Sequence, residues 1–304
     1  RDQPRSRGLG DVYKRQLIYR VVRSGEVRVN KGRAHVDTRL QSGDEVRIPP
    51  IRYTEKESEH SAPPLKLSEM PPILFEDQNI MVVDKLAGMA SHGGSGISYG
   101  LIERMRASRP ELPFLELVHR LDRGTSGVLV LAKTRKALVR LHEMIREGEM
   151  HKTYQALVKG DWQNDRQHAK FPLFKYVTPS GERRVRVDPE NGLPSHSIFR
   201  LKERFGPVSL VEVDLLTGRT HQIRVHAAEL GFPLVGDEKY GDFAFNDEVA
   251  HGSLGVPFKR MFLHSGKICF HHPITGEELE IEAPLPKDCV ELIEVLEQRK
   301  AQNK

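Results

Sequence analysis

A polar turn that leads directly into an apolar strand, at residues 118–133, is the feature that most limits how this chain folds. Asp122 lies in the turn between Arg120 and Arg123, and a seven-residue apolar run follows. A run of that length after turn residues indicates a buried strand. Because loops hold functional side chains on a rigid scaffold, Asp122 is a candidate for a reactive group.

Two glycines, Gly124 and Gly127, follow the acidic residue in this turn. Glycine adopts positive φ without strain and lets a large partner approach the backbone. A second interpretation is that Asp122 caps its own turn and pairs with Arg120 or Arg123. The local pattern favours neither interpretation.

The composition is that of an ordinary soluble protein, with 38% hydrophobic and 29% charged residues. The 304 residues are enough for one large domain and a small one. No run approaches the ~18 apolar residues of a membrane span, and the arginine-rich beginning has no apolar signal-peptide segment. Cys269 and Cys289 provide neither a disulfide framework nor a metal-binding spacing. We expect a cytoplasmic monomer.

The positive charge is concentrated at the beginning of the chain. Residues 1–52 contain 13 Lys and Arg against 6 Asp and Glu, whereas the remainder contains 34 against 36. A basic arm on a near-neutral body indicates a polyanionic partner, with RNA or DNA preferred to a membrane. A basic end that only increases solubility is the alternative.

The first part of the chain predicts a small RNA-binding domain. Residues 1–16 show no periodicity and are treated as non-native or disordered. A short helix is expected at 16–23, and strands are expected at 26–30 and 44–48. Residues 17–52 resemble the alpha-L RNA-binding domain, but the helix that opens that domain is missing, so the copy here is incomplete. Its basic residues should share one surface: Arg20, Arg23, Arg28, Lys31 and Arg33.

Residues 53–72 read as a linker, because two Pro-Pro pairs keep the chain extended and outside both cores. From residue 73 the pattern changes to many strands with helices between hairpins. Strands are expected at 73–77, 80–85, 151–158, 183–187, 195–201, 208–215, 261–270 and 278–283, and helices at 99–107, after Thr134, after residue 221 and at 287–298. Since there is no regular βαβ alternation, the pattern predicts an α+β fold with a mixed, mainly antiparallel sheet and flanking helices.

Two further patterns carry weaker signals. The Gly-rich segment 92–96 matches neither phosphate-binding fingerprint, so a mobile connector is favoured over a phosphate cradle. His221 and His226 are five residues apart on an expected helix, where their side chains diverge. We therefore expect no metal site.

Three separated segments, 119–127, 152–154 and 217–226, together resemble the RluA/RluC/RluD family of pseudouridine synthases, and the RluC type most closely. Segments 236–241 and 262–265 also fit, so the resemblance covers roughly residues 17–300. It implies a pseudouridine synthase catalytic domain at 73–300. The implied reaction is the isomerisation of specific uridines in large-subunit ribosomal RNA, without cofactor or metal.

The resemblance also assigns site residues. Asp122 is the implied essential carboxylate, Tyr154 lies against the target base, and Arg224 pairs with Asp122. These roles make chemical sense, because an adjacent guanidinium lowers the pKa of a carboxyl group and keeps it ionised. Tyr154 offers a flat face for stacking and a hydroxyl for proton transfer, although most such tyrosines are only packed strand residues.

The target base must leave its stack before it can react, which costs a few kcal/mol. A basic residue such as Arg123 could fill the vacated space, and contacts to the RNA backbone would offset the cost. The side chains expected to contact RNA in the catalytic domain are Arg120, Arg123, Arg219 and His221. His119 and His221 are expected to be structural or RNA-contacting rather than catalytic. Two alternatives remain: a transfer-RNA pseudouridine synthase, and a non-catalytic RNA-binding or ribosome-assembly protein.

Overall fold

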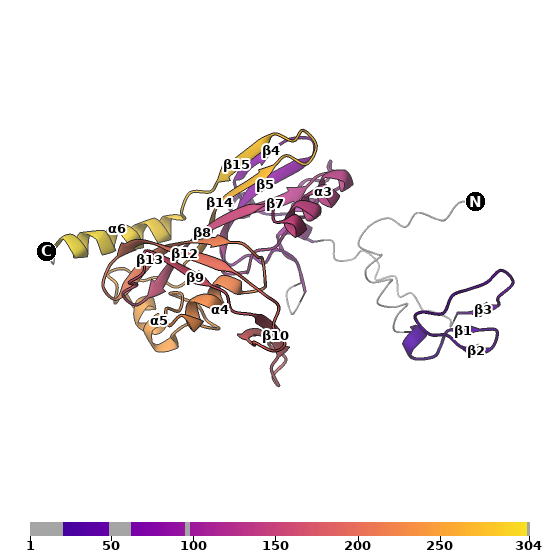
Figure 1. Cartoon of the computed structure of the whole chain (residues 1–304). Helices are drawn as coiled ribbons and strands as arrows, with labels where there is room; N and C mark the ends of the chain where they lie inside the picture. Colours follow the sequence, from indigo (N-terminus) through magenta and orange to yellow (C-terminus); the bar gives the residue numbers. More distant parts are fainter. Residues whose placement is uncertain (1–20, 49–61, 95–97, 303–304) are drawn as a thin grey trace. The chain divides into compact units, whose positions relative to one another are not determined.

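The structure is a computed structural model, and it describes residues 21–48, 62–94 and 98–302. The chain divides into two compact units, residues 1–60 and 61–304, which are labelled by element in Figure 1. No helix among the described residues is long and apolar enough to cross a membrane.

The smaller unit contains a three-stranded antiparallel sheet in the order β2-β1-β3, formed by β1 (Arg28–Val29), β2 (Gly32–Arg33) and β3 (Val46–Arg47). The strands β1 and β3 lie within the predicted segments but are shorter, and β2 was not predicted. Asn30 and Lys31 both have positive φ, 50° and 68°, as a two-residue hairpin turn requires. Residues 21–23 are helical, and most of the expected helix at 16–23 lies outside the described residues, as do residues 1–16.

The described part of the expected linker, residues 62–72, packs on the larger unit. It contains a short 3-10 helix, η1 (Leu67–Glu69), and the side chain of Leu65 is buried in the main core. Glu69 forms an ion pair with Arg104 at 2.5 Å. The expectation that this segment stays outside the core is therefore wrong here, because proline prevents regular hydrogen bonding but not side-chain packing.

The larger unit is built on one ten-stranded sheet in the order β4-β5-β7-β14-β8-β13-β12-β9, with β6 beside β7 and β15 beside β14. Its strands are β4 (Ile73–Glu76), β5 (Ile80–Lys85), β6 (Glu116–Leu117), β7 (Ser126–Ala132), β8 (His151–Lys159), β9 (Arg166–Ala169), β12 (Ser197–Arg204), β13 (Val208–Leu215), β14 (Leu263–His271) and β15 (Glu278–Glu282). Within this described sheet, only the pair β7–β14 is parallel. The predicted α+β class and mainly antiparallel sheet are confirmed.

A separate hairpin, β10 (Leu173–Val177) and β11 (Arg183–Val187), lies beside α4 in Figure 1. The helices are α2 (Leu101–Ser108), α3 (Arg135–Glu147), α4 (Gln222–Glu229), α5 (Phe243–Ala250) and α6 (Lys287–Gln302). Thr134 caps α3 as predicted, since its Oγ1 accepts a hydrogen bond from the Ala137 N–H, and Gly148 ends the helix at φ 75°.

Both faces of the central strands are buried, which explains why β7 has no polar side chain from Gly127 to Ala132. Alternate residues of β5 and β7, such as Val82 and Val130, pack against α3. The residues between them, such as Val83 and Leu129, pack with α2, α4 and Tyr154. This second group of core residues includes Leu121, so this part of the core reaches the turn that contains Asp122.

Gly127 allows β14 to pair with β7. Its φ is +112°, and a Cβ atom built on it would lie 2.1 Å from the backbone oxygen of Ser265. The sequence predicted that a large partner approaches the backbone at this turn. At Gly127 that partner is the strand β14 of the same chain, and not a ligand. Cross-strand pairing also places Lys85 opposite Gly127, and Tyr154 opposite Ser265. This row of residues forms the base of the site.

Candidate active site

The loop that contains Asp122 is fixed by the segment that follows β5. The hydroxyl of Ser91 donates to the carbonyl of Leu121 at 2.7 Å and accepts the Leu121 N–H at 3.1 Å. The N–H of Gly88 donates to the carbonyl of Arg123 at 2.8 Å. These backbone contacts on both sides of Asp122 hold its side chain in one place.

A fully buried lysine, Lys85, lies under the same loop. Its Nζ donates to the carbonyls of Leu86 and Met89, at 2.9 and 2.7 Å. Burial lowers the pKa of Lys85 to about 7, and the nearby Asp122 carboxylate opposes that shift. Sequence reasoning treated Lys85 only as the end of a strand. The signal that could have identified it is a positively charged residue at the end of a strand whose other residues are mostly apolar.

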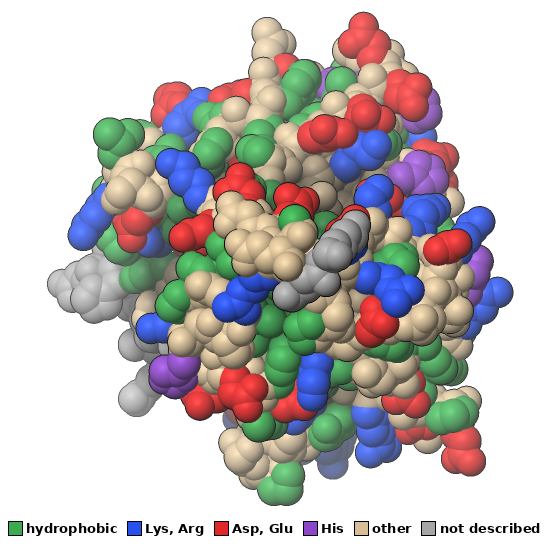
Figure 2. Space-filling view, turned by 90° about the vertical axis from the view of Figure 1, so that its left-hand side faces the viewer, with side chains coloured by type: hydrophobic (Ala, Val, Ile, Leu, Met, Phe, Trp, Pro, Cys, Tyr) green, Lys and Arg blue, Asp and Glu red, His purple; other side chains and the backbone are tan. Residues whose placement is uncertain are grey.

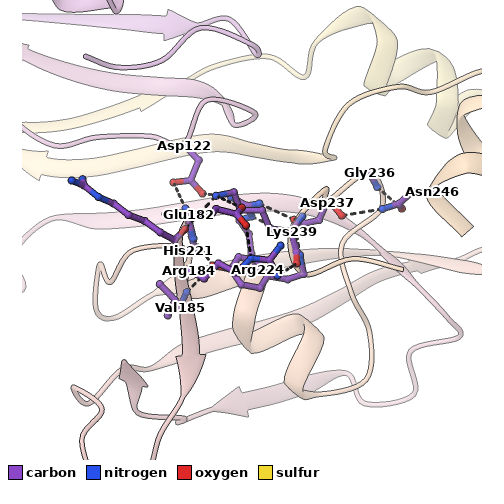
Figure 3. Close-up of polar contacts among 12 residues, drawn as sticks. Asp122, Glu182, Arg184, Val185, His221, Arg224, Gly236, Asp237, Lys239 and Asn246 are labelled. Atoms are coloured by element: carbon purple, nitrogen blue, oxygen red, sulfur yellow. Dashed lines mark hydrogen bonds and ion pairs between the residues drawn. The ribbon is translucent and has the colours of Figure 1, made fainter. Parts of the chain in front are cut away.

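Asp122 has two basic neighbours from the chain around α4. Its Oδ2 accepts a hydrogen bond from Arg224 Nη1 at 3.1 Å, and its Oδ1 lies 3.8 Å from His221 Nε2, as Figure 3 shows. The alternative, in which Asp122 pairs with Arg120 or Arg123, does not occur in the structure. Arg120 instead contacts His92 Nε2 at 2.6 Å, and Arg123 donates to the Gly88 carbonyl at 2.9 Å.

Arg224 has a second and closer partner, Asp237. Arg224 Nε and Nη2 donate to the two Asp237 oxygens at 2.8 and 2.7 Å. The Asp237 side chain is fully buried, whereas that of Asp122 is 27% exposed. Burial alone would raise the pKa of Asp237, but the hydrogen bonds from Arg224 and from the N–H groups of Lys239 and Tyr240 hold that pKa below its usual value.

This geometry adds a second partner to the implied pair. The implied pairing of Arg224 with Asp122 is present, but the carboxylate that Arg224 binds through two hydrogen bonds, and that is fully buried, is Asp237. The sequence segment 236–241 was noted only as a resemblance. The available signal was an Asp at the start of a tight turn, where its side chain can accept hydrogen bonds from the backbone of that turn. In the structure, Asp237 Oδ1 accepts the N–H groups of Lys239 and Tyr240.

His221 is the N-cap residue just before α4 and has a strained backbone conformation, with φ 54°. Its Nδ1 is 2.7 Å from the hydroxyl of Tyr240, which also accepts the N–H of Val185 from the hairpin. Burial lowers the pKa of His221, although the Asp122 carboxylate opposes the shift. His221 is therefore an uncharged polar group at neutral pH, fixed beside Asp122.

Tyr154 forms the floor of the cleft and is 6% exposed. Burial raises the pKa of its phenol, and a hydrogen bond with Ser265 opposes that shift only in part. The phenol is therefore protonated at neutral pH. It offers a ring face and an O–H group, rather than a ready phenolate base.

A cleft of about 1300 Å³ connects these groups. The predicted residues that line it are Arg120, Asp122, Arg123, Tyr154, Arg219, His221 and Arg224. Ten of its lining side chains are Lys or Arg and two are acidic, Asp122 and Glu182. By contrast, Figure 2 shows acidic and basic side chains interspersed on another face of the molecule. Such a one-sided concentration of cations attracts a polyanion.

The predicted basic residues of the smaller unit are placed as follows. Arg28 lies directly opposite Arg33 on one neighbouring strand and Arg47 on the other, so three arginines form a row across the sheet. Arg28 Nη1 donates to the carbonyl of Lys31 at 3.3 Å, and Arg33 Nη2 donates to the carbonyl of Arg23 at 2.7 Å. Arg20 lies outside the described residues. Sequence reasoning missed Arg47, which only the strand register identifies.

The two histidines of the rejected metal site point in different directions. His221 faces Asp122 and Tyr240, whereas His226 is buried against the hydroxyl groups of Ser195 and Ser197. Within residues 21–48, 62–94 and 98–302, no group of three or more His, Cys, Asp and Glu side chains could hold a metal ion.

Residues 79–229 match the family model described as RNA pseudouridylate synthase. Ribosomal large subunit pseudouridine synthase C of Salmonella typhi is 49% identical to this chain, over 93% of the chain and 88% of that protein. The protein of the same name from Escherichia coli strain K12 is 50% identical, over 89% of this chain and 85% of its own length.

Two solved human structures have the same fold. RNA Pseudouridylate Synthase Domain Containing 1 matches with a TM-score of 0.58 and 26% identity, over 77% of this chain and 97% of that one. RNA Pseudouridylate Synthase Domain Containing 4 matches with a TM-score of 0.61 and 23% identity, over 74% and 92%. The sequence matches extend over nearly the whole chain and include the cleft. The chain therefore belongs to the RNA pseudouridine synthase family of isomerases.

Proposed function

We propose that this enzyme converts specific uridines of large-subunit ribosomal RNA to pseudouridine, with Asp122 as the essential carboxylate. The observation that carries the proposal is the position of Asp122. It is a partly exposed carboxylate in a basic cleft, fixed against Arg224. The names of the bacterial relatives, which are half identical to this chain, support the choice of ribosomal RNA.

The proposed reaction is an isomerisation. The bond between N1 of uracil and C1′ of ribose breaks, the base turns, and C5 bonds to C1′. The proton lost from C5 is balanced by the proton gained at N1, so the reaction needs no cofactor or oxidant. Asp122 would act through its carboxylate, whether it adds to the sugar or removes a 2′ proton, and Arg224 would stabilise negative charge there through the hydrogen bond from Nη1.

Tyr154 would stack on the uracil ring. Because its phenol is protonated, its hydroxyl would relay the C5 proton, giving up its own proton as it accepts that one. The RNA backbone would contact Arg120, Arg123, Arg219 and His221, which line the same cleft. Arg123 would fill the space that the flipped base leaves. These contacts would offset the cost of unstacking.

We also propose that residues 17–52 act as an incomplete alpha-L RNA-binding domain and that the catalytic domain extends to residue 300. In the smaller unit, Arg20, Arg23, Arg28, Lys31 and Arg33 would bind RNA. The row formed by Arg28 with Arg33 and Arg47 supports this, because like charges directly opposite each other repel unless an anion lies between them. The protein would act in the cytoplasm as a monomer, without metal.

The test is to map pseudouridines in total RNA from cells that contain the wild-type protein, no protein, or Asp122→Asn. We expect sites in large-subunit ribosomal RNA that disappear without the protein and are not restored by Asp122→Asn, while that variant still binds RNA. Glu182→Gln is the control, because it changes the other acidic side chain of the cleft in the same way. Pseudouridines restored by Asp122→Asn would refute the role of Asp122.

Two other outcomes would favour the competing functions. Sites lost only from transfer RNA would indicate a transfer-RNA pseudouridine synthase. If Asp122→Asn restored ribosome assembly in cells that lack the protein, a non-catalytic assembly role would be supported.

A further inference from the structure

We propose that Lys152, His119 and Arg146 form a subsite in the cleft that binds a backbone phosphate of the RNA beside the target uridine. This inference rests on the proposed RNA substrate. All three side chains line the same cleft as Asp122. Their common property is that each has hydrogen-bond donors for which the described residues supply no acceptor.

Lys152 is a partly buried cation without a protein partner. In the described part of the chain, its Nζ has no hydrogen bond and no ion pair, although ion pairs are common elsewhere in this charged protein. Burial lowers the pKa of Lys152 to about 8, and no carboxylate opposes the shift. An ammonium group with three unsatisfied donors in such a place is costly unless a ligand supplies the acceptors.

His119 supplies a second unsatisfied donor. Its Nε2 accepts the N–H of Val130 at 3.1 Å, so the proton of the neutral ring is on Nδ1. Burial, together with the charge of Lys152, lowers the pKa of His119 and keeps the ring neutral. Among the described residues, His119 Nδ1 is the only buried side-chain polar atom without a hydrogen-bond partner. The lysine charge acts on this ring, and both residues line the same cleft.

Arg146 adds a third set of donors. It lies in the last turn of α3, is exposed, and has no ion pair or hydrogen bond with the residues that the structure describes. The three side chains therefore offer two positive charges and one N–H group, and none offers a carboxylate. A phosphodiester, with its negative charge and accepting oxygens, has the matching chemistry.

The position of Lys152 relative to Tyr154 fits one nucleotide. The two residues are alternate members of β8, so their side chains leave the same face of the strand, with backbone positions roughly 6.6 Å apart. A uracil that stacks on Tyr154 would leave its sugar and phosphate within reach of the longer lysine side chain. The subsite would thus fix the backbone while the base turns.

The stability of variants separates this role from a structural one. A lysine required for packing would make Lys152→Met less stable than the wild type. An unpaired, partly buried ammonium predicts the opposite, a melting temperature equal to or above that of the wild type, because the apolar side chain removes a desolvation cost. The same substitution should weaken RNA binding.

The experiment uses the full chain and a stem-loop RNA fragment that contains a uridine modified by the wild-type enzyme. If the wild type modifies no fragment, a single-stranded oligouridylate is used instead for binding alone. Affinity is measured by fluorescence anisotropy from 50 to 300 mM salt, and kcat and KM by pseudouridine formation. We expect Lys152→Met to raise Kd and KM about tenfold, to change kcat less than about twofold, and to reduce the salt slope by about 0.7–0.9.

Lys152→Arg should retain the wild-type slope, because it keeps the cation. Lys136→Met is the control: it removes an exposed lysine of α3 that does not line the cleft, and it should change neither slope nor KM. A wild-type slope and KM in Lys152→Met, or a clear loss of its stability, would overturn the subsite. If the wild type forms no pseudouridine, that result counts against the proposed function. The subsite is still tested in that case, because the salt dependence of binding is measured without turnover.

Discussion

Arg224 binds the buried carboxylate of Asp237 through two N–H groups, at 2.8 and 2.7 Å, and this pair fixes the guanidinium before any RNA arrives. The remaining nitrogen, Nη1, is then directed at Asp122. Asp237 itself is held by the backbone of its own turn, and Asn246 donates to its carbonyl at 3.0 Å. The direction in which Arg224 Nη1 points towards Asp122 therefore depends on a carboxylate that does not line the cleft.

Asp237→Asn should be strongly destabilising. The amide replaces one anionic acceptor with an NH₂ group that faces the buried guanidinium, and one member of a buried ion pair is lost. We expect the free energy of unfolding to fall by roughly 3–5 kcal/mol in chemical denaturation. Glu182→Gln, which removes a partly exposed carboxylate paired with Arg184 and Lys239, should cost less than about 1 kcal/mol. If Asp237→Asn lowered the free energy of unfolding no more than Glu182→Gln does, Asp237 would not be the buried partner that holds Arg224.

Arg224→Lys should lower kcat more than it lowers RNA affinity. A lysine ammonium retains the charge but cannot bind Asp237 through two parallel hydrogen bonds and reach Asp122 as well. We expect kcat to fall at least about tenfold, with Kd for RNA within about threefold of the wild type, since one cation remains. Single-turnover pseudouridine formation and anisotropy measure the two quantities. Equal kcat values in the variant and the wild type would show that the guanidinium fork has no catalytic importance.

Gly127→Ala tests the contact between β7 and β14. The added Cβ would lie 2.1 Å from the Ser265 oxygen at a φ of +112°, so we expect a loss of roughly 3 kcal/mol or more in the free energy of unfolding. Gly181→Ala is the matched control. Gly181 also has positive φ, +84°, but no atom lies within 4 Å of the added Cβ, so only the backbone cost of about 1 kcal/mol remains. Similar losses in both variants would mean that the strand contact can relax.

The pH dependence of stability should reveal the buried cation Lys152. Its pKa is about 8 in the folded protein, against an ordinary value of 10.5. Between these pH values the unfolded chain binds more protons, so the free energy of unfolding rises with pH in this range. The wild type should gain roughly 1–2 kcal/mol relative to Lys152→Met between pH 8 and 10.5, a value reduced for solvent screening. Denaturation curves at both pH values measure it, and parallel pH profiles would contradict the burial of this amine.

Local sequence signals predicted many elements of the larger unit. The strands β11 and β13 have the expected bounds, and Thr134 and Gly148 cap α3 as expected. The short strands β6 and β9 were not predicted, because two to four residues give too little periodicity. The helix α5 was also missed, since its apolar residues do not form one clear stripe.

Long-range relationships were beyond the local signals. The resemblance implied that Asp122 and Arg224 pair, and the structure brings them within 3.1 Å. Nothing local indicated that Arg224 would bind Asp237 more closely, because the two residues belong to different segments that meet only in the folded chain. The same reason applies to Lys85, whose acceptors are backbone carbonyls of the following loop. The roles of these residues in catalysis stay predictions.

The place of β14 has a consequence for protein synthesis. This strand is among the last made, yet it lies in the centre of the sheet and separates β7, which follows Asp122, from β8, which carries Tyr154. A growing polypeptide therefore lacks the bridge between the two halves of the cleft until residues 263–271 have left the ribosomal exit tunnel. The aspartate and the tyrosine can face a common substrate only after that point, so an interrupted translation product that ends before β14 would be inactive.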